Sequence, residues 1–246
     1  MKMKIAILVL SFSFGLSSGL NINFGLNKMF DVFGYTSNDI ADIIEDVPDT
    51  RADTLPPPHD QVARMARFIA HNSDWAALAT IATREPIMGF PFANVLSISD
   101  GPLDNSTGVP YIYISPWEIS ARDLSHNNKA SLTMSLAQVN HNFLQIPHLH
   151  TINICQSGYC AKMDYDPEDP RCAHVILTGE FIKLEPESEE EEFARNALFT
   201  RHPIMSDWPA GHHWFFAKID IQNILILDWF GGAVTVPVQD YFEVKP

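Results

Sequence analysis

The sequence predicts a mostly β fold with peripheral helices (α+β), arranged as an antiparallel β-barrel or split barrel. Seven short apolar runs are rich in β-branched residues, only two long segments show helical spacing, and turn-forming residues separate the runs. The chain of 246 residues is 46% hydrophobic, which excludes a wholly disordered protein.

The first 19 residues have the three parts of a secretory signal peptide. A short basic region, Met1–Lys4, precedes the apolar stretch Ile5–Leu16, and the small residues Ser17–Gly19 follow. We expect cleavage before Leu20. The alternative, a membrane anchor, needs about 20 apolar residues, which exceeds this stretch. The sequence therefore predicts a secreted, extracellular protein.

The next segment, residues 20–58, is predicted to be a poorly ordered lead-in. It is rich in Asn and Gly, then acidic, and it ends in three consecutive prolines. Apolar residues then recur at helical spacing over residues 59–71, which predicts an amphipathic helix with Val62, Met65, Ala66 and Ile69 on one side. We place the globular domain at residues 59–246.

The apolar runs that follow predict the strands. Period-two alternation is clearest at Leu132, Met134 and Leu136, which would share one face. A turn-rich loop from Asp100 to Gly108 joins two strands and carries the sole N-glycosylation sequon, so we expect a glycan on Asn105. The predicted strands cover residues 75–82, 92–98, 110–115, 130–137, 173–183, 213–221 and 224–229.

Two further helices are predicted between strands. The first is a short helix over residues 119–127. The second is a long helix that opens with a capping box at Ser188–Glu191 and buries Phe193, Ala197 and Leu198. The glutamates between Glu185 and Glu192 are interpreted as a solvated first turn favoured by the helix dipole, not as a calcium site.

The charge balance argues against two classes of partner. The chain has 16 Lys and Arg against 30 Asp and Glu, a formal net charge of −14. Such a surface repels phosphate backbones and anionic lipid headgroups. We therefore expect no binding to nucleic acid.

The three cysteines, Cys155, Cys160 and Cys172, lie close together in the sequence. In an oxidising compartment two of them should pair and one is left over. His148 and His150 lie nearby and complete a set of zinc-type ligands, but their spacing matches no standard closed site. We predict no metal site.

Sequence signatures of enzymes are absent. The chain has no phosphate-binding glycine loop, no Gly-x-Ser-x-Gly elbow and no His-Glu-x-x-His motif. His202, His212 and His213 flank Trp208 and Trp214, and no carboxylate or nucleophile stands at a recognisable spacing from them, which favours a packing or surface role. We predict no catalytic residues.

Several ordered sequence blocks carry a resemblance to a known family. They are Ser73–Ile81, Gly89–Ser97, Gly108–Tyr111, Ser131–Met134, Arg201–Pro203, Trp214–Lys218 and Asp228–Gly232. Together they resemble the CREG family of secreted cellular-repressor glycoproteins, with few gaps from about Pro56 to Pro246.

The resemblance implies a split β-barrel of the FMN-binding type, related to pyridoxamine-phosphate oxidase, and a homodimer. It implies a secretory or endolysosomal glycoprotein without oxidase activity. Such a protein modulates growth and differentiation through protein partners, such as a cell-surface or sorting receptor. The alternative is a flavin (FMN)-dependent oxidoreductase that kept the ancestral pocket. Either interpretation expects an apolar face shared between subunits, and Trp214, Phe215, Phe216, Trp229 and Phe230 are candidates for that face or for the core.

The cysteines are assigned with the help of this resemblance. Residues from about His141 to Gly158 look like an insertion relative to the family, and Cys155 lies within it. The spacing of Cys160 and Cys172 is the one that the family suggests, and the Asp-Pro steps between them favour turns. We therefore predict a disulfide bond between Cys160 and Cys172.

In related cofactor-binding barrels, the segment matching Ser120–Leu124 places basic or hydroxyl groups near a flavin phosphate. Arg122 would be the main donor there, with Thr80, Ser97 and Ser115 as lesser candidates. The alternative for Arg122 is an ordinary surface salt bridge.

A bound FMN needs several donors for its doubly charged phosphate, because a buried unpaired charge is costly. Between residues 75 and 137 the only lysines and arginines are Arg84, Arg122 and Lys129. We predict a protein without tightly bound flavin, although backbone amides could supply donors.

Overall fold

The computed structural model describes residues 55–139 and 158–246. The predicted signal peptide, the lead-in up to residue 54, both His148 and His150, and Cys155 lie outside the described residues. Residues 56–139 and 158–246 belong to one compact unit. Among the described residues, no helix is long and apolar enough to cross a membrane.

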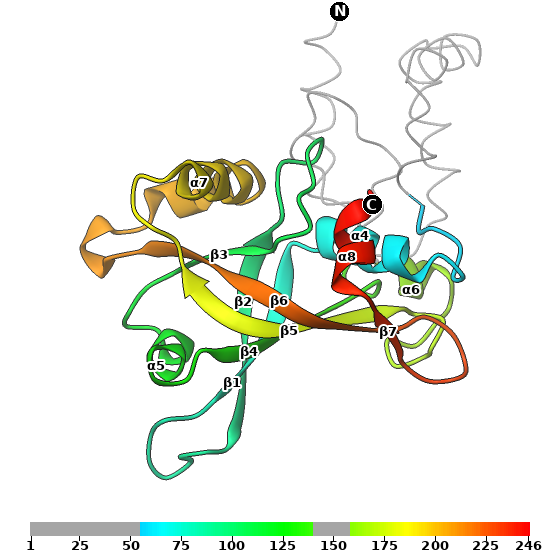
Figure 1. The fold of residues 1–246 in the computed structure, drawn as a ribbon, viewed down its shortest axis with the longest axis horizontal. Helices are drawn as coiled ribbons and strands as arrows, with labels where there is room; N and C mark the ends of the chain where they lie inside the picture. The colour runs from blue at the N-terminus through cyan, green and yellow to red at the C-terminus, as the bar shows by residue number, and fades with distance from the viewer. Residues whose placement is uncertain (1–54, 140–157) are drawn as a thin grey trace, which may run out of the picture. The chain divides into compact units, whose positions relative to one another are not determined.

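The core of this unit is a closed antiparallel β-barrel, as the sequence predicted (Figure 1). The sheet order is β3-β2-β1-β4-β5-β6-β7, and an additional pairing of β3 with β6 closes the barrel. The strands are β1 (Trp75–Ile81), β2 (Pro91–Ser99), β3 (Tyr111–Ile114), β4 (Lys129–Ser135), β5 (His174–Lys183), β6 (Phe215–Leu227) and β7 (Val234–Val236).

Alternation along the strands fills the barrel. Ala76, Leu78 and Thr80 on β1 are buried, whereas Trp75, Ala79 and Ile81 between and beside them are exposed. Strands β4 and β5 alternate in the same way, so Leu132, Met134, Val175 and Leu177 complete the interior. Because neighbouring side chains on a strand point to opposite faces, this inner set fixes which residues must face outward.

The predicted strands 213–221 and 224–229 form one strand, which corrects the sequence interpretation. In β6 the register against β5 shifts between Thr178 and Gly179, so an extra β6 residue breaks the alternation. That break in the pattern looked like a strand boundary. At the bulge Gly179 is required, because a Cβ there would lie 1.8 Å from the carbonyl oxygen of Asp220. The sequence analysis missed β7, which is too short to show periodicity.

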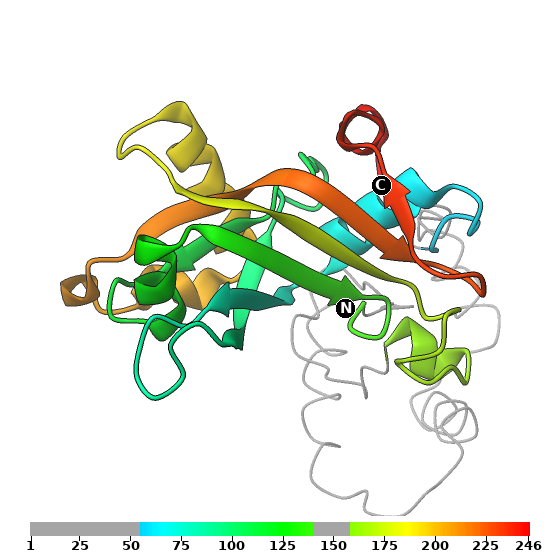
Figure 2. The same cartoon turned by 60° about the horizontal axis from the view of Figure 1, so that its bottom comes forward.

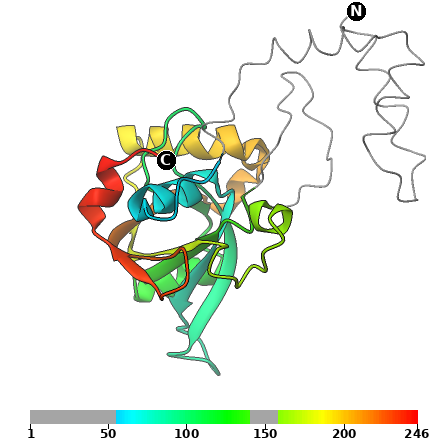
Figure 3. The same cartoon turned by 90° about the vertical axis from the view of Figure 1, so that its right-hand side faces the viewer.

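Helices cover both ends of the barrel. α4 (Val62–Asn72) packs against β4, β5 and β7, and beside α8 (Val238–Glu243). Figure 3 shows α4 and α8 side by side, at the opposite end from the β1–β2 hairpin. At the hairpin end, α5 (Ile119–His126) packs on β1 with Ala121 and Leu124 in the main core.

α7 (Glu189–Arg201) begins at the predicted capping box and covers β3 and β6 through a second apolar cluster. The Ser188 hydroxyl accepts a hydrogen bond from the Glu191 N–H at 3.1 Å. Ala197 and Leu198 are buried as predicted, whereas Phe193 is half-buried against Tyr111. Two short 3₁₀ helices, η2 (Pro203–Asp207) and η3 (Ala210–His212), lead from α7 into β6.

The predicted disulfide bond is confirmed. Cys160, on the short helix α6 (Tyr159–Lys162), is bonded to Cys172, and their Cα atoms are 5.5 Å apart. Both cysteines are buried within the main core. The bond ties α6 to the residues that lead into β5, on the right-hand side of Figure 2.

We expect replacement of both paired cysteines, Cys160→Ser with Cys172→Ser, to lower the free energy of unfolding by about 3 kcal/mol. A crosslink that closes a loop of this size removes that much entropy from the unfolded chain in the loop-closure treatment. Denaturant unfolding under non-reducing conditions measures the loss. Cys155→Ser is the matched control and should leave stability unchanged. Equal effects of the two changes would contradict the assignment.

Candidate functional site

The outward side chains of β1, of Pro91–Ser97 on β2, of Ser131–Ser135 on β4 and of His174–Thr178 on β5 form one continuous surface, here called the barrel face. The strand registers place Val95 beside Ala77, Ala77 beside Thr133, and Thr133 beside Ile176, in a row across four strands. The face comprises Trp75, Ala77, Ala79, Ile81, Pro91, Ala93, Val95, Ser97, Ser131, Thr133, Ser135, His174, Ile176 and Thr178.

The barrel face has no carboxylate, lysine or arginine, in a chain whose formal net charge is −14. Its apolar members are accessible, with Val95 62% exposed and Trp75 42% exposed. Charges first appear at the edge of the face, where Lys129 stands opposite Glu180. Contiguous exposed apolar surface of this kind marks interaction sites on soluble proteins.

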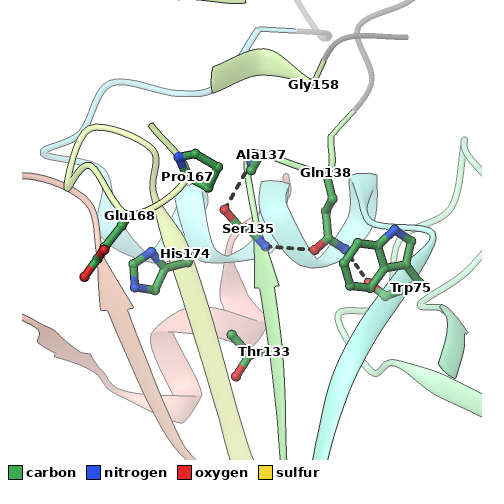
Figure 4. A pocket seen from close by; sticks show the side chains of 9 residues that line it. All are labelled: Trp75, Thr133, Ser135, Ala137, Gln138, Gly158, Pro167, Glu168 and His174. Atoms are coloured by element: carbon green, nitrogen blue, oxygen red, sulfur yellow. Dashed lines mark hydrogen bonds between the residues drawn. The ribbon is translucent and has the colours of Figure 1, made fainter. Parts of the chain in front are cut away.

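A cavity of about 680 Å³, broadly open to solvent, lies at one end of the barrel face (Figure 4). Its floor comes from β1, β4 and β5 through Trp75, Thr133, Ser135 and His174. Its walls come from the turn after β4 (Ala137 and Gln138), from Gly158 at the start of α6, and from Pro167 and Glu168 in the loop closed by the disulfide bond.

Hydrogen bonds hold the cavity in shape. The Gln138 side chain accepts a hydrogen bond from the Ser135 N–H at 3.3 Å and donates one to the carbonyl oxygen of Trp75. The Ser135 hydroxyl accepts from the Ala137 N–H at 3.1 Å. Figure 4 shows two of these bonds within the turn after β4 and the third joining that turn to the start of β1. The cavity therefore has a defined rim beside the exposed indole of Trp75.

The loop that carries the predicted glycosylation site is fixed by a buried ion pair. His71 Nδ1 on α4 lies 2.6 Å from Asp100 Oδ1, and His71 Nε2 lies 3.1 Å from the carbonyl oxygen of Leu103. Both partners are acceptors, so each ring nitrogen of His71 faces an oxygen atom. Asp100 also accepts from the Ser106 hydroxyl at 2.5 Å and from the Gly108 N–H at 3.0 Å. Burial raises the pKa of Asp100, but these partners outweigh it and the pKa is lowered.

A buried arginine joins the same loop to the C-terminal helix. Arg67 donates to the carbonyl oxygen of Ser106 at 3.0 Å and to that of Tyr241 at 3.2 Å. Tyr241 in turn donates to the carbonyl oxygen of Gly108 at 2.8 Å. Gly108 is required here, since a Cβ would lie 2.8 Å from the guanidinium of Arg67 and its φ is +80°. The Asn105 side chain remains exposed on this rigid loop.

The four residues proposed for a flavin phosphate do not converge on one point. Arg122 is exposed and donates to the carbonyl oxygen of Trp117 at 2.7 Å. Thr80 is buried inside the barrel, whereas Ser97 lies on the barrel face opposite Trp75. Ser115 follows β3 and donates to the carbonyl oxygen of His212 at 2.8 Å.

Asp123, which the sequence analysis did not single out, organises the polar groups beneath α5. It accepts from the Thr83 N–H at 2.9 Å and pairs with Arg84 at 3.0 Å. Burial raises the pKa of Asp123, but the bonds from Thr83 and Arg84 outweigh it and lower the pKa. Arg84 also stacks over the Phe92 ring. No sequence signal links Asp123 with Arg84, which lie 39 residues apart.

The histidines and tryptophans near α7 pack on one another. His212 stacks with Trp214, Trp208 packs on Trp214, and Tyr113 lies against both tryptophans. His202 bonds through Nε2 with the carbonyl oxygen of Ile98 at 2.9 Å. Among the aromatic candidates for core or shared surface, Phe216 is buried, Trp214 and Phe215 are half-buried, and Trp229 and Phe230 are exposed.

A buried carboxyl group lies at the end of β6. Asp228 is buried, and its Oδ2 has no hydrogen-bond partner among the described residues. Burial raises the pKa of Asp228 to about 7. This carboxyl group therefore titrates in a range where an ordinary aspartate is fully ionised.

Comparisons with known proteins identify the family. Residues 57–243 match the family model described as "CREG, beta-barrel". Protein CREG1 of Gallus gallus is 47% identical over 195 residues, which cover 78% of this chain and 91% of the relative. Protein CREG1 of Homo sapiens is 45% identical over 195 residues, covering 78% of this chain and 80% of the relative.

A similar solved structure confirms the fold class. The heme binding protein from Mycobacterium smegmatis is 18% identical, with a TM-score of 0.53. The match covers 78% of this chain and 62% of that chain. At this identity the similarity shows the fold alone, a split β-barrel.

We expect Asp100→Asn to lower the free energy of unfolding by about 3–5 kcal/mol at pH 7, because it leaves the buried His71 without its charged partner. The pKa of Asp100 is lower in the folded protein than in the unfolded chain. The stability that its carboxylate contributes is therefore complete above the unfolded-state pKa and is lost as pH falls through the folded-state pKa. The difference in unfolding free energy between the variant and the natural protein should therefore persist at pH 5 and shrink below about pH 4. Denaturant unfolding at several pH values measures it. Asp104→Asn, an exposed change in the same loop, should have no such effect.

We expect the opposite pH dependence from Asp228→Asn. The folded protein holds the Asp228 proton up to about pH 7, whereas the unfolded chain releases it near pH 4. Asp228 therefore makes the natural protein lose stability as pH rises from about 4 to about 7. The variant should be more stable at pH 7.5 by about 4 kcal/mol, since the shift is about three pKa units, and should lose the advantage at pH 4. Asp220→Asn, an exposed change on β6, is the control. An unchanged pH profile in the Asp228 variant would contradict the assignment.

Proposed function

The chain belongs to the CREG family, and from this premise we propose that it is a non-enzymatic glycoprotein that acts through protein partners. It is secreted or endolysosomal, forms a homodimer through the barrel face, and modulates cell growth and differentiation. A cell-surface or sorting receptor is the kind of partner expected. This function rests on binding surfaces, not on a catalytic site.

The observation that carries the proposal is the absence of Lys, Arg, Asp and Glu from the barrel face. Two copies of a chain with a net charge of −14 repel each other over most of their surface. Self-association therefore needs a contact surface that carries no like charges and offers apolar area to bury. The barrel face meets both needs, since Val95 and Ile81 are exposed and its remaining members are mostly small.

Two features support a secretory route. The Cys160–Cys172 disulfide bond is of the kind that persists in oxidising compartments. The exposed Asn105 stands on a loop that His71 and Arg67 hold in place, so a glycan there would project into solvent without disturbing the core.

The positions of the lysine and arginine side chains support the proposal that the protein binds no flavin. An FMN phosphate needs donors that are free to face it. Arg84 is committed to Asp123 and Arg122 lies on the surface beside Trp117. Lys129 stands at the edge of the barrel face opposite Glu180. These residues fit a phosphate group poorly, which disfavours the alternative of an FMN-dependent oxidoreductase.

We expect the purified protein to be a dimer without absorbance at the flavin bands, and Val95→Glu to convert it to a monomer. The change places two carboxylates in an apolar interface, where unpaired charges are costly. Sedimentation velocity measures the dimer, and a visible spectrum after gel filtration measures the flavin.

Val234→Glu is the matched control, because Val234 is an exposed valine on β7 outside the barrel face. It should remain dimeric. If the Val95→Glu protein stays dimeric, the barrel face is not the dimer interface. Flavin absorbance that disappears on Arg122→Ala would favour the oxidoreductase.

A further inference from the structure

The acceptor triplet for N-glycosylation, residues 105–107, has an exposed asparagine but a bonded threonine. Thr107 Oγ1 donates to the carbonyl oxygen of Asp100 at 2.6 Å and accepts from the Val109 N–H at 3.1 Å. A hydroxyl group has one proton to donate and two lone pairs with which to accept, so the bond to Asp100 uses the only proton of this group. The exposure of Asn105 therefore does not make the whole triplet free.

The threonine hydroxyl matters because of what the triplet must contain. The third position of the triplet is Ser or Thr, and the second is any residue except Pro. Ser and Thr share a hydroxyl group on Cβ, so the enzyme that reads the triplet must contact that group. In the folded protein, Thr107 has no proton left to donate to such an enzyme.

The backbone of the triplet is bonded as well. The Thr107 N–H donates to the carbonyl oxygen of Asp100 at 3.0 Å, and the Asn105 N–H donates to that of Pro102 at 2.9 Å. The carbonyl oxygen of Asn105 lies so close to Gly101 that a Cβ on Gly101 would be 1.9 Å from it. An enzyme that draws the triplet into its active site has to break these contacts.

Ser106 ties the triplet to buried groups that come from distant parts of the chain. Its hydroxyl donates to Asp100 Oδ2 at 2.5 Å and accepts from Arg67 at 2.9 Å, and Arg67 also donates to the carbonyl oxygen of Tyr241. The Tyr241 hydroxyl donates to Gly108, which lies 133 residues earlier in the chain. The loop is therefore complete only after synthesis has passed Tyr241. At about 5–20 residues per second, synthesis of that stretch takes roughly 7–27 s.

Resting on the proposed function as a glycoprotein, we infer that Asn105 receives its glycan only while the loop 100–108 is open, and that folding of the loop closes the site. In the transfer, Asn105 Nδ2 forms a bond to C1 of the first sugar of a lipid diphosphate-linked oligosaccharide and releases a proton to solvent. The bond between that C1 and the diphosphate breaks, and the diphosphate leaves with the electron pair. An enzyme that accepts only the open loop acts on the fraction of molecules in which the loop is open.

A reconstituted transfer reaction tests the inference. The acceptors are the natural chain, folded without a glycan, and a peptide of residues 98–112 that carries the same triplet without the fold. With purified oligosaccharyltransferase and a lipid-linked oligosaccharide, we expect the peptide to be modified at least tenfold faster than the folded chain. Mass spectrometry at Asn105 measures both rates. Equal rates would overturn the inference.

Gly101→Ala should restore modification of the full chain. Its new Cβ collides with the carbonyl oxygen of Asn105 and displaces the loop, while the triplet itself is unchanged. Gly211→Ala is the matched control, because a Cβ there meets nothing within 4 Å, and it should react as slowly as the natural chain. Far-UV circular dichroism checks that both variants keep the fold. A folded Gly101→Ala protein that stays as slow as its control would contradict the inference.

A reversible block of glycan transfer in secreting cells tests the natural sequence without any substitution. Chains completed during the block should remain without the glycan after the inhibitor is removed, whereas chains made afterwards should carry it. Addition of the glycan to chains completed during the block would overturn the inference. If Asn105 carries no glycan under any condition, and the peptide is not modified either, the proposed glycoprotein itself is wrong.

Discussion

The pairing of β6 with both β3 and β5 closes the barrel, and the rest of the structure depends on that closure. The first half of β6 lies opposite Tyr111–Ile114 on one side and the second half of β5 on the other. Closure removes the free edges of these strands, where unpaired backbone groups would otherwise face water or another chain. A bulge in β6, opposite Gly179 of β5, separates the half of β6 that pairs with β3 from the half that pairs with β7.

Closure also separates the outer surface into parts with different roles. α7 covers β3 and β6 through its own apolar cluster, and α4 and α8 pack at the end that carries the glycosylation loop. The outer side of β2, β1, β4 and β5 keeps exposed apolar side chains. Four glutamates, Glu189–Glu192, are concentrated in the first turn of α7. An acidic protein with one surface free of like charge is suited to binding its own copy there.

Buried polar groups then fix the parts that strand pairing leaves free. His71 and Asp100 hold the loop with Asn105, Arg67 ties that loop to the C-terminal helix, and Asp123 anchors Arg84 at the base of the hairpin. Most of their polar atoms have partners on other elements, which makes their burial tolerable, whereas Arg67 Nε has no hydrogen-bond partner among the described residues. Asp228 is different, because burial holds its proton to about pH 7. In the described part of the chain, Asp228 is therefore a carboxyl group whose protonation changes near pH 7.

The sequence by itself determined the fold class, the capping box at Ser188 and the Cys160–Cys172 bond, the last with the help of the family resemblance. These features depend on residues that are near one another in the chain, or on blocks that keep their order. Only the tertiary structure decided that β6 is one strand, that Arg84 faces Asp123, and that Trp75 borders a cavity. Arg67 contacts the carbonyl oxygen of Tyr241 across 174 residues. Periodicity along the chain reports which side of a strand is buried, but not which distant segment covers it, because that choice is made by closure of the barrel.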